Sequence, residues 1–343
     1  MGSTAWNAPN TAVDTSGLTT ALTTPQSGVD DIRTGTAFRS DVLAAGRLVH
    51  VHPSVDGRYL AVFSERWTAA TPKPTLPGEY SAKTVVTRPA AFWVSPHAST
   101  EHVIIGGGIG QVHSSTDLQA IAGASHNHLM VLLCTIGGVG ALVRYRVDGR
   151  NVNVVSSQYL SHSFPATGAA VVWNRGVHIS GTYLYVLGGR ESGELFLMKL
   201  LLTHGAQSPL YLGARGWTGN QEDLYSLRDK NNAVLTSRGP VSVARYGNEW
   251  YLSTVVESAG SYSVRFHRAG HPASPWQKLS STVSLGSDSK GAAFFQSSVQ
   301  ANPDHPDVSM PEVVAGLPVV YNVQQGDALR TRWRVLGVPR FRL

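Results

Sequence analysis

The run PVSVARYGNEWYLSTVV, residues 240–256, decides the fold class of this chain, together with YSVRFHR, residues 262–268. Each run is rich in β-branched and aromatic residues and has no helical period. Tyr246-Gly-Asn and Ser258-Ala-Gly-Ser separate the runs, and Gly and Asn tolerate the positive φ of tight hairpin turns. The stretch therefore predicts three consecutive antiparallel strands.

Within this unit we expect Trp250 on the middle strand, with Val241 and Val243 pointing inward. Similar units recur along the chain as an inner apolar strand, a middle aromatic strand and an outer strand with charges. They repeat roughly every 50–70 residues, about five times, as blades of a propeller do. We predict an all-β, five-bladed β-propeller with under about a tenth of its residues helical, and a two-sheet β-sandwich is the alternative.

The composition places this chain among globular proteins. It has 343 residues, of which 42% are hydrophobic and 15% charged. No run approaches the length of about 18 apolar residues that spans a bilayer, so we expect no membrane insertion. Residues 1–35 are rich in Thr, Ala, Ser and Gly without a period. They predict an extended N-terminal arm, and residues 36–343 the propeller domain.

Charge and special residues exclude several function classes. The net charge is +6, but the basic residues are scattered except near the C-terminus, so we expect no nucleic-acid partner. The single cysteine, Cys134, lies in an apolar run and is predicted to be a buried structural thiol. No helix is predicted after the run Gly106–Gly110, which therefore predicts no nucleotide cofactor. His126 and His128, predicted on one strand face, have no third ligand at motif spacing, so no metal is expected.

Three segments carry a resemblance to a known family. They are Phe38-Arg-Ser-Asp-Val-Leu-Ala44, the loop AGHPASPW at residues 269–276, and Asn302-Pro-Asp-His-Pro306. Together they resemble five-bladed propellers of the actinobacterial endo-D-arabinanase type, which also occur in tail proteins of phages that infect those bacteria. The family's early "Phe-Gly-Asp-Thr" context is missing here.

Glycoside hydrolysis uses two carboxyl groups that flank the scissile bond. In a propeller we expect such groups to project from inner strands into an axial cleft. The candidate catalytic acids are Asp31, Asp41 and Glu101. Sugar rings stack on aromatic side chains, and their hydroxyls bind polar groups. The candidate substrate-binding residues are accordingly Arg39, Trp93, His113, Trp217 and His305. Most of the tryptophans are expected in blade cores.

The function hypotheses follow from this resemblance. The first is a glycan-recognising propeller, a phage tail or surface protein that contacts an arabinose-rich actinobacterial cell envelope and other subunits of an assembly. The second is an active endo-acting glycoside hydrolase. The third is a purely structural tail or scaffold subunit. Residues 1–10 have no basic start and no apolar run, so no signal peptide is expected. The expected location is a virion or an extracellular surface, and the cytoplasm if the protein is a host enzyme.

Overall fold

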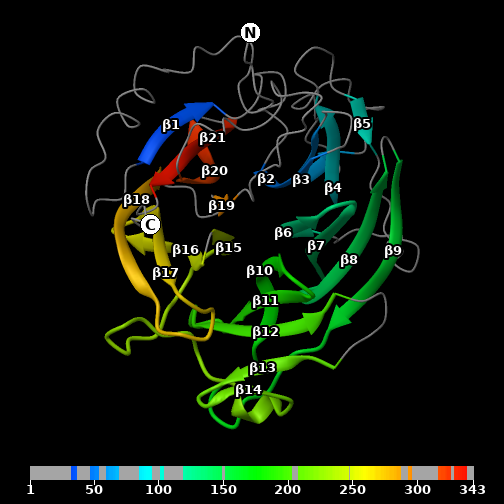
Figure 1. Cartoon of the computed structure of the whole chain (residues 1–343). Helices are drawn as coiled ribbons and strands as arrows, with labels where there is room; N and C mark the ends of the chain where they lie inside the picture. The colour runs from blue at the N-terminus through cyan, green and yellow to red at the C-terminus, as the bar shows by residue number, and fades with distance from the viewer. Residues whose placement is uncertain are drawn as a thin grey trace.

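A computed structural model describes residues 32–36, 47–53, 59–68, 85–94, 101–103, 119–148, 151–202, 208–246, 248–286, 293–295, 316–325 and 328–337. Among these residues, the 3-10 turn η1 (Gln221–Asp223) is the only helical segment. The strands form five antiparallel sheets arranged around a common centre (Figure 1). The five-bladed β-propeller is confirmed, and the two-sheet sandwich is wrong because the described strands form five sheets and not two.

The blades follow one another along the chain, and each begins with its inner strand. Blade 1 consists of β2 (Arg47–Pro53), β3 (Tyr59–Thr68), β4 (Val85–Val94) and β5 (Glu101–Val103). Blade 2 consists of β6 (Gln119–His126), β7 (Leu129–Ile136), β8 (Val139–Asp148) and β9 (Asn151–Leu160). Blade 3 consists of β10 (Val172–Ser180), β11 (Tyr183–Gly189), β12 (Leu195–Leu201), β13 (Leu210–Gly213) and β14 (Gly216–Thr218).

The last two blades complete the ring. Blade 4 consists of β15 (Ser242–Tyr246), β16 (Glu249–Ser258), β17 (Ser261–Ala269) and β18 (Gln277–Gly286). Blade 5 consists of β19 (Ala293–Phe295), β20 (Gly316–Gln325), β21 (Ala328–Gly337) and β1 (Ile32–Thr36). Inner strands of successive blades contact each other from β2 to β19, and β2 in turn contacts β20 and β21.

Strand β1 closes this ring from the N-terminal side. It adds to the outer edge of the C-terminal blade, with Ile32 opposite Leu336 and Thr36 opposite Arg332 on β21. The expected boundary between an arm at residues 1–35 and a domain at residues 36–343 therefore falls inside a strand. Residues 1–31 lie outside the described part, so this division of the chain stays a prediction.

The core consists of apolar layers between neighbouring blades. One layer joins blades 2 and 3 around Trp173, and another joins blades 3 and 4 around Trp250 and Trp276. These three tryptophans are at most 5% exposed, which confirms that Trp residues fill blade cores. The free thiol of Cys134 is buried, and burial raises its pKa to about 12, so it is structural as predicted.

Residues 240–268 form the three predicted antiparallel strands. β15, β16 and β17 pair antiparallel in sequence, Trp250 lies on β16, and Val241 and Val243 are buried. Ala259 and Gly260 have φ of 50° and 76°, so the turn between β16 and β17 uses two left-handed residues, as a type I′ hairpin does. In the described part of the chain, no helix is long and apolar enough to cross a bilayer.

Candidate functional site

Most of the sequence-predicted site residues lie outside the described residues: Asp31, Asp41, Arg39, His113 and His305. Glu101 and Trp93 lie opposite each other on the neighbouring strands β5 and β4. β5 is the outermost strand of blade 1, and strands in a sheet are spaced by about 4.8 Å. The backbone of Glu101 is therefore three strands away from the inner strand, which does not match the axial position on which its assignment rested.

The inner strands carry imidazole and guanidinium groups where paired acids were expected. No Asp or Glu occurs within the described inner strands β2, β6, β10, β15 and β19. Their titratable residues other than tyrosine are Arg47, His50, His52, His126, Arg175, His178 and Arg245. An axial pair of carboxyl groups would consequently have to come from segments outside these strands.

Two of these histidines meet a serine between blades 1 and 2. Ser125 Oγ on β6 lies 2.5 Å from His50 Nε2 and 2.8 Å from His52 Nδ1. Since the hydroxyl has one proton, it donates to one ring and accepts from the other. Burial lowers the pKa of His50 to about 3 and that of His52 to about 4, so both rings are neutral near pH 7.

His126 and His128 do not share a strand face, contrary to the sequence-based expectation. His126 ends β6, whereas His128 lies in the turn that follows, after Asn127 with φ of 51°. His128 Nδ1 is 3.4 Å from Asp148 Oδ1. Among the residues that the structure describes, no three His, Cys, Asp or Glu side chains are arranged to hold a metal ion.

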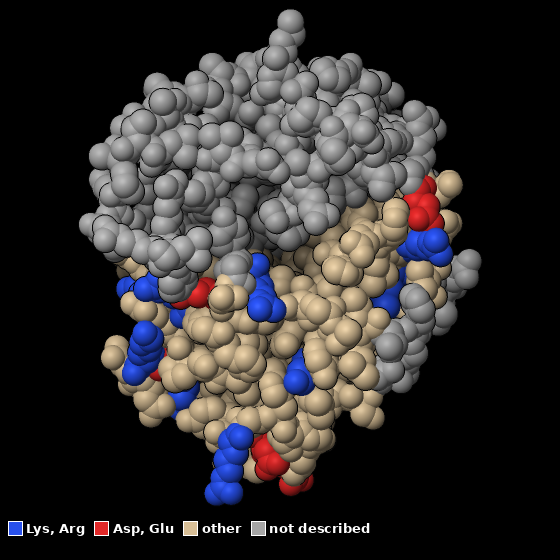
Figure 2. All heavy atoms as spheres, in the orientation of Figure 1, with Lys and Arg blue, Asp and Glu red and all other residues tan. Residues whose placement is uncertain are grey.

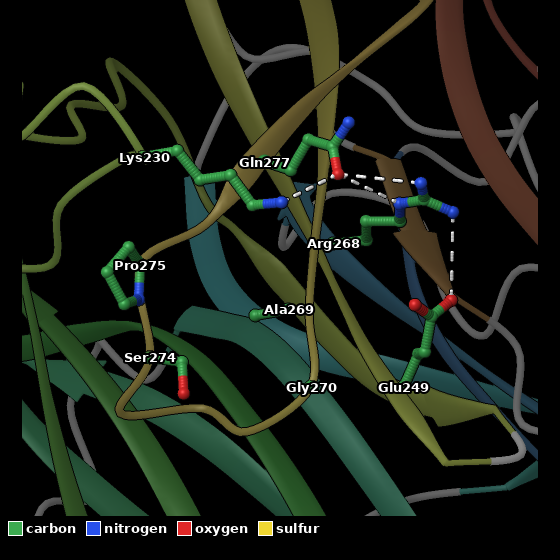
Figure 3. A pocket seen from close by; sticks show the side chains of 8 residues that line it. All are labelled: Lys230, Glu249, Arg268, Ala269, Gly270, Ser274, Pro275 and Gln277. Carbon is green, nitrogen blue, oxygen red and sulfur yellow. Dashed lines mark hydrogen bonds and ion pairs between the residues drawn. The ribbon is translucent and has the colours of Figure 1, made fainter.

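A pocket of about 580 Å³ opens on blade 4, within the range of small-molecule sites. Its lining residues are Lys230, Glu249, Arg268, Ala269, Gly270, Ser274, Pro275 and Gln277. Figure 3 shows the side chains of Lys230, Gln277, Arg268 and Glu249 linked in one chain of polar contacts.

Strand register places three of these side chains together. Arg268 on β17 lies opposite Tyr251 on β16 and opposite Gln277 on β18, and Glu249 lies two residues before Tyr251. Because side chains two residues apart share a sheet face, these four residues lie on one side of blade 4. The opposite side carries Trp250 and packs against blade 3.

A structured turn brings Lys230 to the same pocket. Asp229 Oδ1 accepts the backbone N–H groups of Asn231 and Ala233, both at 2.8 Å. The Lys230 N–H donates to the carbonyl oxygen of Trp276 at 3.0 Å, immediately before β18. The connection between blades 3 and 4 is therefore fixed to the pocket wall.

The polar contacts within the pocket form two groups, one around Gln277 and one around Glu249. Gln277 Oε1 accepts from Lys230 Nζ at 3.1 Å and from Arg268 Nε and Nη2 at 3.4 Å. Glu249 Oε2 accepts from the Tyr251 hydroxyl at 2.9 Å and is 3.9 Å from Arg268 Nη1. The pocket thus offers ammonium, guanidinium and hydroxyl donors together with one carboxylate, a set that suits a polyhydroxylated ligand.

Trp217, the predicted sugar-stacking residue on β14, belongs to a cluster on blade 3. Lys199 Nζ lies 4.4 Å from the Trp217 ring centroid and 4.5 Å from that of Tyr183. The ammonium group lies over both rings, which is an attractive cation–π arrangement. Tyr183, Trp217 and the loop residue Ala273 pack against the same apolar cluster, so the aromatic rings lie near the loop that lines the pocket.

Sequence reasoning selected the loop at residues 269–276 but not the polar residues around it. Arg268 and Gln277 flank this loop directly, and Lys230 is 47 residues from Gln277. Arg268 and Gln277 could have been found from the sequence, because they directly flank a loop that the family resemblance selected. Lys230 had none, because only the tertiary structure brings it there.

Comparisons with known proteins support the fold. No family model matches the sequence, and no curated protein matches it. A candidate hydrolase from Bacteroides ovatus is similar in structure, with a TM-score of 0.50, 12% identity, and coverage of 91% of this chain and 93% of that one. A GH43_1 enzyme from Xanthomonas citri has a TM-score of 0.50, 12% identity, and coverage of 85% and 87%. At this identity the likeness concerns the fold alone.

Proposed function

We propose that this chain is a glycan-recognising β-propeller whose saccharide site includes the pocket on blade 4. The observation that carries the proposal is the convergence of Lys230, Glu249, Arg268 and Gln277 around one pocket of about 580 Å³. Sugar hydroxyls both donate and accept hydrogen bonds, so cationic and amide donors beside a carboxylate acceptor match them. Trp217 and Tyr183 on the neighbouring blade provide aromatic surface near the same loop.

Binding without cleavage is the form of this proposal that the described residues favour. The described inner strands hold no carboxyl group, and the acid of the pocket, Glu249, already accepts a hydrogen bond from Tyr251. Glycoside hydrolysis through two carboxyl groups requires a separation of about 5–10 Å across the bond. Among the described residues that line this pocket, Glu249 has no second Asp or Glu beside it.

Titration calorimetry with arabinan oligosaccharides and other envelope glycans tests the proposal directly. We expect saturable binding that the variant Arg268→Ala weakens, because Arg268 contributes three of the donor atoms at the pocket wall. The exposed Arg215→Ala provides a matched control on blade 3. Failure of every tested saccharide to bind the folded wild-type protein would overturn the proposal.

The biological setting that we propose is a phage tail or virion protein that contacts an arabinose-rich actinobacterial envelope. Its support is the resemblance of residues 38–44, 269–276 and 302–306 to propellers found in such tail proteins. Other subunits of the assembly would be its partners. Sedimentation with isolated actinobacterial cell walls tests this setting, and equal sedimentation with walls stripped of arabinan would contradict it.

An active endo-glycosidase is the second candidate, and Asp41 is the residue that favours it. Asp41 lies between β1 and β2, six residues before the inner strand of blade 1 begins. Asp31 directly precedes β1 at the outer edge of blade 5. If the protein cleaves glycan, new reducing ends should appear in arabinan, and Asp31→Asn or Asp41→Asn should abolish them while leaving binding intact.

A further inference from the structure

We propose that the pocket on blade 4 is selective for an acidic sugar, and that Lys230 and Arg268 together bind its single negative charge. This inference rests on the proposed function, since it specifies the ligand of the same pocket. A carboxylate on a uronic acid unit is the ligand group to which we assign the site.

The charges that line the pocket are unbalanced. Of the lining residues that the structure describes, Lys230 and Arg268 are positive and only Glu249 is negative, which leaves one net positive charge among them. Among the described residues, no carboxylate lies within 4.0 Å of Lys230 Nζ. An anion that enters the pocket would therefore supply the missing charge.

Lys230 and Arg268 also share a hydrogen-bond acceptor that cannot neutralise their positive charge. The ammonium of Lys230 and two nitrogens of Arg268 converge on the neutral amide oxygen of Gln277. Hydrogen bonds from charged donors to a carboxylate are shorter and roughly twice as strong as those between neutral partners. A ligand carboxylate placed beside Gln277 would give both cations a better partner than the amide.

The site is largely built before a ligand arrives. Arg268 and Glu249 are 25% and 19% exposed, so their side chains are held by the sheet. The backbone of Lys230 is fixed by its bond to Trp276 and by the turn at Asp229. Only the exposed ammonium end of Lys230 has to adjust, so binding loses little conformational entropy.

One negative charge fits this pocket better than two. A single carboxylate neutralises the net charge of the lining, whereas a dianionic phosphate would leave an excess charge beside Glu249. A sulfate ester on a sugar also carries one negative charge, so the experiment must separate carboxylate from sulfate.

The experiment compares three matched oligosaccharides by titration calorimetry at low salt: a uronic acid form, its carboxyl-reduced neutral form and a sulfated form. For the wild-type protein we expect the uronic acid form to bind about tenfold more tightly than the neutral form, a difference of about 1.4 kcal/mol. The preference should decrease as salt rises, because ions screen the partly exposed Lys230.

Two variants with the same charge change locate the effect. Lys230→Gln should bind the uronic acid form no more tightly than the neutral form, because it removes the ammonium that the ligand carboxylate would contact. Lys278→Gln removes an equal charge from the opposite face of blade 4, since Lys278 pairs with His267. It should behave like the wild-type protein.

Each contrary result has its own meaning. If charged and neutral forms bind the wild-type protein equally, or if the two variants lose the preference equally, the acidic-sugar inference is overturned and the proposed function stands. Tighter binding of the sulfated than of the uronic acid form would overturn the assignment to a carboxylate. If none of the three forms binds, the acidic-sugar inference is overturned, whereas the proposed function is decided separately by the titration with arabinan oligosaccharides.

Discussion

Strands β16, β17 and β18 form both faces of blade 4, and near the pocket one face is apolar whereas the other is polar. Trp250 and Leu252 on β16 point toward blade 3 and join a buried layer with Trp276. Glu249 and Tyr251 alternate with these two residues along β16 and point the other way, toward the polar pocket. Near the pocket, one face therefore packs in an apolar layer and the other carries Glu249 and Arg268, so substitutions of Trp276 and Arg268 should separate stability from binding.

The largest effect should come from the buried face at Trp276. The Trp276 ring is 1% exposed within the layer between blades 3 and 4. Trp276→Ala should lower the free energy of unfolding by about 3–5 kcal/mol, since it removes buried surface and leaves a cavity. Urea denaturation measures this change. Trp276→Phe is the control. Its stability loss should be much smaller, because Phe refills most of the space and also removes a buried indole N–H that has no hydrogen-bond partner among the described residues.

The pH dependence of stability should sharpen the same contrast. His267 on the blade 3 side is buried against Thr254, and burial, aided by the charges of Lys278 and Arg265, lowers its pKa to about 4. The unfolded chain binds a proton near pH 6.5 while the folded protein does not, so stability falls as pH decreases from about 6.5 to 4. The full change for His267 is roughly 3 kcal/mol.

Denaturation at several pH values compares the wild-type protein with His267→Gln. The variant should lose less stability between pH 6.5 and 4, although His50, His52 and His178 keep part of the slope, since burial lowers their pKa as well. The exposed His126→Gln should keep the wild-type slope. An unchanged slope in His267→Gln would show that His267 titrates normally.

Binding should respond to the pocket face at Arg268. Arg268→Ala removes donors near the ligand, and a hydrogen bond from a charged group contributes about 1.5–3 kcal/mol. Affinity for the bound glycan should therefore fall by about tenfold or more, while the unfolding free energy changes by about 1 kcal/mol or less. Calorimetry and urea denaturation of one preparation measure both quantities. A stability loss comparable to that of Trp276→Ala would break the division between the two faces.

The smallest effect should come from the hairpin turn that joins β16 and β17. Ala259 holds a left-handed φ of 50°, which Asn adopts at lower cost than Ala. Ala259→Asn should stabilise the protein by roughly 0.5 kcal/mol without changing glycan affinity. Thermal unfolding measures this shift, and a destabilised variant would argue against a strained turn.

Local sequence patterns were enough to predict the strand content and the blade repeat. Strand runs and Gly or Asn turns predicted β15, β16 and β17 with Trp250 on the middle strand, because local sterics and burial set those features. The family resemblance also selected the loop at residues 269–276, and residues of this loop line the pocket. Paired acids on inner strands were expected as well, but the described inner strands carry none, since a family resemblance does not determine which strand is innermost.

Contacts between residues far apart in the chain could not be predicted from such patterns. β1 closes blade 5 by pairing with β21 at the other end of the chain, and Lys230 reaches Gln277 across 47 residues. Ser125 likewise contacts His50 from 75 residues away. Strand periodicity reports which face of a sheet a side chain occupies, whereas packing between blades determines the neighbours of that face. That packing depends on many weak apolar contacts summed over the whole ring, which no short stretch of sequence contains.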